Sequence, residues 1–68
     1  MPDYATNWKL NLLVEALNAE VANLERLIKS NEESLAEYPH AYAAATLRTE
    51  VSAYKYARLR LQSILNNV

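Results

Sequence analysis

The chain contains a single histidine, His40, and one spacing around it is typical of metal ligands, Glu37-x-x-His40. In helical bundles that hold two iron ions, a glutamate and a histidine three residues apart supply two ligands from one helix. Pro39 lies between these two residues, and a proline inside a helix breaks it and would misplace the ligands. The chain has no second Glu-x-x-His motif, so we expect no metal site.

Other residue types that catalysis uses are scarce. No serine–histidine–aspartate constellation can be argued from one histidine, and the 68 residues include no cysteine that could act as a nucleophile. The chain also contains no glycine, which excludes the glycine-rich loops that hold phosphate groups. We therefore expect no catalytic residue, no cofactor and no enzymatic activity.

Basic side chains are the remaining candidates for chemistry. On a helix, Arg48, Lys55 and Gln62 recur every seven residues beside Arg58 and would form a strip. Arg48, Lys55 and Arg58, with Arg60 as a further candidate, could bind an anionic ligand, such as RNA or a phosphorylated small molecule. However, residues 1–38 carry seven acids and three bases, whereas residues 39–68 carry one acid and four bases, which favours pairing within the chain. The formal net charge of -1 also argues against a generic nucleic-acid binder, so binding of RNA or a nucleotide is our second interpretation.

Apolar side chains recur at alternating spacings of four and three residues, which is typical of helices that pack along a heptad seam, as in a coiled coil. The seam consists of Leu10, Val14, Leu17, Val21, Leu24, Ile28, Asn31, Leu35 and Tyr38, and then of Ala44, Leu47, Val51, Tyr54, Arg58, Leu61, Leu65 and Val68. A proline ends one helix and suits the first turn of the next. We predict an all-α, antiparallel helical hairpin that forms a single domain over residues 1–68, with helices over about 4–38 and about 39–66.

The first helix has one position where it can break. Ser30 and Glu33 match a capping box, the pattern that often starts a helix, and Asn31 is a polar residue in the seam. A restart here would give three helices, with residues 31–38 as a short middle one. Alternatively, Asn31 lies within a continuous helix and fixes its register.

A tight turn at Pro39 predicts which seam residues face one another. Ile28 would meet Val51, and Asn31 would meet Leu47. Arg58, the only charged residue in the seam, would lie opposite Glu20 and either pair with it or extend its aliphatic stem over the core.

Apolar residues also lie outside the seam, at spacings that place them on the outer sides of the two helices. A chain of this size buries only about 60% of its unfolded surface, and without cysteines it has no disulfides to stabilise it, so self-association is expected. We predict that the hairpin forms a dimeric four-helix bundle or a higher helical oligomer. The residues expected at protein interfaces are Trp8, Leu12, Ala16, Ala19, Tyr42, Ala45, Tyr56 and Leu59.

The function that these features favour is that of a small helical interaction protein, an adaptor, assembly factor or inhibitor, that binds itself and another macromolecule. No apolar run approaches the roughly 20 residues that cross a membrane, so we expect no membrane partner. The first residues lack a secretory signal, and a cytoplasmic location is therefore the default expectation. These properties suit an accessory protein of a bacterium or phage.

Overall fold

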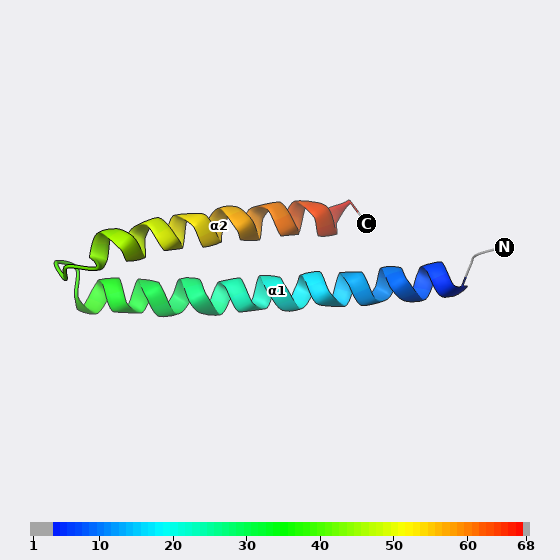
Figure 1. Ribbon diagram of the computed structural model, residues 1–68, viewed down its shortest axis with the longest axis horizontal. Coiled ribbons are helices and arrows are strands. Elements are labelled where there is room, and N and C mark those ends of the chain that lie inside the picture. Colours follow the sequence, from blue (N-terminus) through cyan, green and yellow to red (C-terminus); the bar gives the residue numbers. More distant parts are fainter. Residues whose placement is uncertain (1–3, 68) are drawn as a thin grey trace.

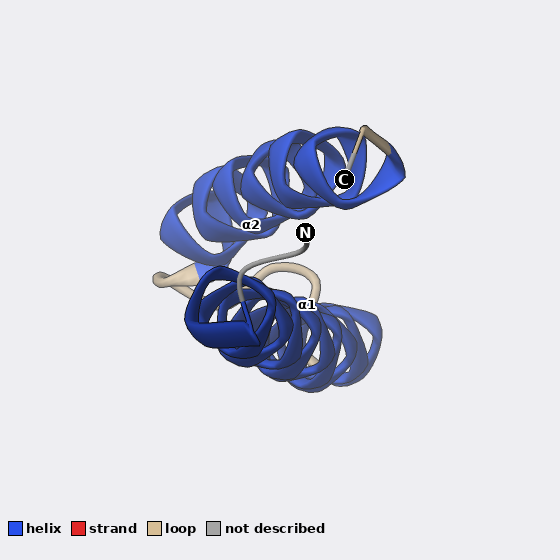
Figure 2. Ribbon diagram, turned by 90° about the vertical axis from the view of Figure 1, so that its right-hand side faces the viewer, coloured by secondary structure: helices blue, strands red, loops and turns tan. Residues whose placement is uncertain are grey.

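The computed structural model describes residues 4–67, which form two helices, α1 (Tyr4–Glu37) and α2 (Ala44–Asn66), and contain no strand. The helices lie side by side and run in opposite directions (Figure 1). Viewed along the long axis, they form a single pair with no third layer (Figure 2). The Cα atoms extend over 59 × 15 × 13 Å, so the molecule is a thin rod. The predicted all-α helical hairpin is confirmed, whereas its predicted assembly into oligomers stays a prediction.

The seam holds the two helices together, but it is buried unevenly. Leu24, Ile28, Ala44 and Val51 are 6%, 5%, 3% and 7% exposed, and they all lie in the half of the rod nearer the turn. Toward the other end, the seam residues Val14, Leu17, Leu61 and Leu65 are only half-buried. The apolar contact between α1 and α2 is therefore strongest beside the turn. Val68, the last predicted seam residue, lies outside the described residues.

The predicted alternative of a break near Ser30 and Asn31 is wrong, because α1 is continuous from Tyr4 to Glu37. Ser30 and Glu33, the two residues of the capping box, are both exposed to solvent. Apolar packing continues on either side of them, at Ile28 and at Leu35, so the helix gains more from continuing than from ending.

The second helix begins at Ala44 rather than near Pro39. The first helix ends at Glu37, two residues before the proline, as the restriction on the residue preceding proline leads one to expect. The chain must then cross the distance of about 8–10 Å between the two helix axes before it can return. Residues 38–43 make this crossing as a turn, in which the Ala41 N–H donates to the Tyr38 carbonyl (3.2 Å) and the Ala44 N–H to the Ala41 carbonyl (2.9 Å).

The longer turn shifts the register of α2 against α1. Asn31, which was predicted to face Leu47, instead donates a hydrogen bond to Glu50, three residues further along α2. Arg58, which was predicted to face Glu20, instead lines a hollow together with Glu25 and residues of α1 nearer the turn. No ion pair joins Arg58 and Glu20 within residues 4–67, so that predicted pairing is wrong. The facing residues are displaced by about one helical turn.

The uneven core predicts a difference between two matched substitutions. Leu24→Ala removes a buried side chain, and we expect it to lower the free energy of unfolding by about 2 kcal/mol or more. In a domain of this size, such a loss lowers the unfolding temperature by roughly 10 °C. Leu59→Ala makes the same change at an exposed position and should alter stability by less than about 0.5 kcal/mol. Thermal unfolding at low protein concentration, followed by far-UV circular dichroism, measures both. Equal losses would mean that Leu24 is not part of the core.

Candidate interaction surfaces

Two side-chain contacts between the helices lie on opposite sides of the seam. On one side, the Asn31 Nδ2 group donates a hydrogen bond to Glu50 Oε2 over 3.2 Å, in a partly buried position. On the other side, Lys55 Nζ lies 3.1 Å from Glu32 Oε1, and both side chains are about half exposed. Because residues three, four and seven apart share one side of a helix, these two contacts identify which residues of α1 and α2 lie on each broad face of the hairpin.

The face that contains the Lys55–Glu32 salt bridge is polar along its length. Heptad spacing from Glu32 and Lys55 adds Glu25 on α1, and Arg48 and Gln62 on α2. A shallow hollow of about 530 Å³ lies between the helices here, and its charged lining residues are Glu25, Lys29, Glu32, Glu33 and Arg58. We call this side of the hairpin the polar face. Its acids and bases are intermixed, so it presents no surface of one sign to a ligand.

The four basic residues predicted to bind an anion have separate surroundings. Arg48 donates a hydrogen bond from its guanidinium group to the Pro39 carbonyl oxygen (2.9 Å) and thereby ties α2 to the turn. Lys55 pairs with Glu32, and Arg58 is half-buried in the hollow among glutamates. Arg60 is exposed. Three of these bases thus have partners or acidic neighbours within the chain, and binding of an anionic ligand stays a prediction.

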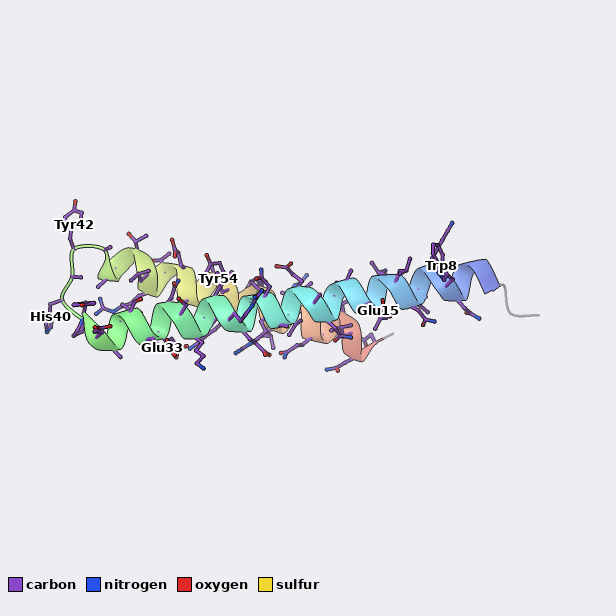
Figure 3. All side chains as sticks on the ribbon, turned by 90° about the horizontal axis from the view of Figure 1, so that it is seen from below. Trp8, Glu15, Glu33, His40, Tyr42 and Tyr54 are labelled. Atoms are coloured by element: carbon purple, nitrogen blue, oxygen red, sulfur yellow. The ribbon has the colours of Figure 1, made fainter. Side chains whose placement is uncertain are left out.

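The metal-type spacing of Glu37 and His40 is interrupted in the structure. Glu37 is the last residue of α1, and His40 lies beyond it in the turn, exposed to solvent (Figure 3). Within the part of the chain that the structure describes, no three His, Cys, Asp or Glu side chains gather around a common point that could hold a metal ion.

The opposite broad face, which contains the Asn31–Glu50 hydrogen bond, is largely apolar. On α1, Leu27 lies four residues before Asn31 and Leu13 lies two heptads before Leu27; on α2, Ala57 and Ile64 follow Glu50 at heptad spacing. All four residues therefore lie on this side. Leu13, Leu27 and Ile64 are exposed. We call this the apolar face. This face was not predicted from the sequence, although a second run of four-three spacings indicates it, through Lys9, Leu13, Ala16, Glu20, Asn23 and Leu27.

The residues predicted at protein interfaces are all exposed, but they do not form one continuous surface. Trp8, Leu12, Ala16 and Ala19 lie on α1 away from the seam, and Ala45, Tyr56 and Leu59 lie on α2 away from the seam. Tyr42, predicted to belong to the second helix, lies in the turn instead. Figure 3 shows Trp8 and Tyr42 at opposite ends of the rod, with their side chains projecting outward. The predicted set therefore divides into at least two surfaces.

The fold and these surfaces define a class: an antiparallel helical hairpin with a short core and apolar side chains on several outer surfaces. Comparisons with known protein families, with curated proteins and with solved structures find no match to this chain. Neither α1 nor α2 combines the length and the apolar character required to span a membrane.

The two contacts between the helices are expected to differ in strength. A double-mutant cycle with Asn31→Ala and Glu50→Ala should give a coupling energy of about 1 kcal/mol, because the hydrogen bond is partly buried and involves a charged acceptor. The same cycle with Glu32→Ala and Lys55→Ala should give less than about 0.5 kcal/mol and fall further in high salt, since this pair is half exposed. Urea unfolding at two salt concentrations measures both couplings, and a larger value for the exposed pair would contradict the assignment.

Proposed function

We propose that this chain is a non-enzymatic helical interaction protein that associates with itself and with another macromolecule, as an adaptor, assembly factor or inhibitor. The observation that carries the proposal is the small core. Among residues 7–67, whose side chains the structure describes, only Leu24, Ile28, Ala44 and Val51 are buried, and none of them is less than 2% exposed. Ten large apolar side chains in the same part of the chain are exposed. Burying such side chains against a partner is worth about 25 cal/mol per Å².

The dimensions of the molecule support association. Its accessible surface is 5494 Å². A compact monomer of 7.7 kDa would expose about 4,300 Å², so this hairpin exposes roughly 1,200 Å² more than its mass requires. The radius of gyration, 16.5 Å, likewise exceeds the value of about 11 Å for a globular domain of 68 residues. Association with a partner is the ordinary way in which a chain with this shape covers its surplus surface.

The different outer surfaces suit different partners. Tyr56 and Leu59 are exposed on the side of α2 that faces away from α1, and tyrosine is among the residues that contribute most to protein interfaces. We propose that the other macromolecule is a protein that binds this side of α2. Binding of an anionic ligand through Arg48, Lys55, Arg58 and Arg60, and a cytoplasmic location, stay predictions.

A paired binding experiment tests this role. The chain and its variant Tyr56→Ser/Leu59→Ser, which should keep the helical circular dichroism spectrum because both residues are exposed, are used as baits in an extract of the native host. We expect specific proteins on the unaltered chain that are reduced about ten-fold or more on the variant. Lys29→Ser/Glu33→Ser on the polar side is the matched control. Equal capture by all three baits would contradict a binding role for this side of α2.

A further inference from the structure

The first helix extends beyond the second. From the Asn31–Glu50 contact, α2 continues for sixteen residues to Asn66, which therefore lies opposite about residue 15 of α1. Residues 4–14 of α1 consequently have no part of α2 beside them, as Figure 1 shows. We call this segment the overhang. Asn67 caps the end of α2: its N–H donates to the Ile64 carbonyl, and its side-chain amide donates to the Ser63 carbonyl (2.9 Å).

The overhang exposes several large apolar side chains, although no part of α2 lies beside it. Trp8, Leu10, Leu12 and Leu13 are 62%, 43%, 46% and 57% exposed. Leu10 continues the seam that α2 covers further along the rod. A helix that continues an apolar seam past the end of its partner requires a further helix with a matching seam.

We propose that the overhang is the docking site for a second copy of this chain, which docks in the antiparallel direction so that each copy covers the overhang of the other. This inference rests on the proposed self-association and assigns it to a particular surface. Lys9, Leu13, Ala16 and Glu20 follow one another at spacings of four, three and four residues and lie on the side of α1 that forms the apolar face. All four side chains are exposed.

Charge complementarity sets the register of this contact. With the two-fold axis between Leu13 and Ala16, Lys9 of each copy faces Glu20 of the other, and Leu13 faces Ala16, in alternating layers typical of antiparallel helix pairs. A shift by one heptad would place Lys9 against Leu27 and leave both charges unpaired. Of these four residues, the first is the base Lys9 and the last is the acid Glu20. In the antiparallel arrangement, the dimer therefore contains two Lys9–Glu20 pairs, one at each end of the contact.

The same arrangement supplies the helix that the overhang lacks. In each copy, α2 ends opposite about residue 15 of its own α1, which is close to the proposed two-fold axis. By symmetry, the α2 helix of the second copy also ends near this axis, but it approaches the axis from the opposite end of the dimer. Its Leu61 and Ile64, which are half-buried and exposed in the single chain, then lie beside Leu10 of the overhang. Each α1 would be flanked along its length by one α2 or the other.

The surface available is sufficient for a stable dimer. The hairpin exposes roughly 1,200 Å² more than a compact monomer of its mass, and a standard interface covers about 800 Å² on each partner. The overhang supplies four of the ten large apolar side chains that are exposed within residues 7–67. The contact therefore needs only part of the surplus, and the outer side of α2 with Tyr56 and Leu59 is left free.

A charge swap tests the register. Sedimentation equilibrium over a range of concentrations measures the dissociation constant of the dimer, and the unaltered chain should be a dimer. Lys9→Glu and Glu20→Lys should each raise this dissociation constant by about ten-fold or more, because each places two like-charged pairs opposite one another. The double variant Lys9→Glu/Glu20→Lys restores opposite charges and should return the dissociation constant to near its original value. Lys29→Glu and Glu33→Lys, away from the stripe, are the matched controls and should have little effect.

Disulfide trapping gives an independent measurement, since the chain has no cysteine of its own. The variant Leu13→Cys/Ala16→Cys should form a covalent dimer on oxidation, whereas Glu33→Cys/Ala36→Cys, with the same spacing on the other side of α1, should not.

The outcomes separate this inference from the proposed function. If the single charge reversals do not change the dissociation constant, or if the double variant does not restore it, the overhang contact is overturned. The proposed self-association would then remain, but it would use another surface. Equal trapping of both cysteine pairs would also overturn it. A monomer at all concentrations would remove both the overhang contact and the proposed self-association, whereas the binding role of Tyr56 and Leu59 is decided by the capture experiment.

Discussion

The structure depends on one stripe of apolar contact between two helices. Two cylinders can touch only along a line, so each helix covers a limited part of the other, and the remaining surface faces solvent. In this chain the line is further shortened, because α2 has 23 residues and α1 has 34. The result is a core of four buried side chains beside the turn, a half-buried seam beyond it, and ten large apolar side chains within residues 7–67 that remain exposed.

The two broad faces differ in how many charges flank the seam: several acids and bases lie close together on one side, whereas on the other side Lys9, Glu20 and Glu50 are separated by apolar residues. Glu32 on α1 pairs with Lys55 on α2, and Glu25 lines the same hollow as Arg58, so part of the opposite charge of the two helices is matched within the chain. On the other side, the flanking positions are mostly Leu, Ala and Ile, with Asn31 and Glu50 joined at the seam itself. A partner that buries the polar face would have to desolvate several charges, whereas the apolar face costs less to cover.

The sequence predicted the helices and the hairpin well because a repeat of four and three residues encodes a helix and its contact side directly. It did not predict the register, which depends on the length of the turn, and nothing in the spacing of the seam shows that residues 38–43 are needed to cross between the axes. The capping-box pattern at Ser30 was misleading because packing at Ile28 and Leu35 outweighs a local signal.

The surfaces were predicted less completely. The outer positions of Trp8, Tyr56 and Leu59 follow from spacing alone and are exposed as expected. The apolar face was missed because its stripe on α1 includes Lys9 and Glu20, and a search for apolar periodicity passes over a pattern that charged residues interrupt. Which stripes of α1 and α2 share a face becomes evident only from the contacts of Asn31 and Lys55 across the seam.

The concentration of buried side chains beside the turn also has a consequence for how the hairpin opens. Amide groups near Ile28 and Val51 are held by packed neighbours and require nearly complete unfolding before they can exchange with solvent hydrogen. Amides near Leu10 are held by α1 alone and exchange through local fraying. Opening thus starts at the end of the rod where α1 begins and α2 ends, and it proceeds toward the turn beside Ala44.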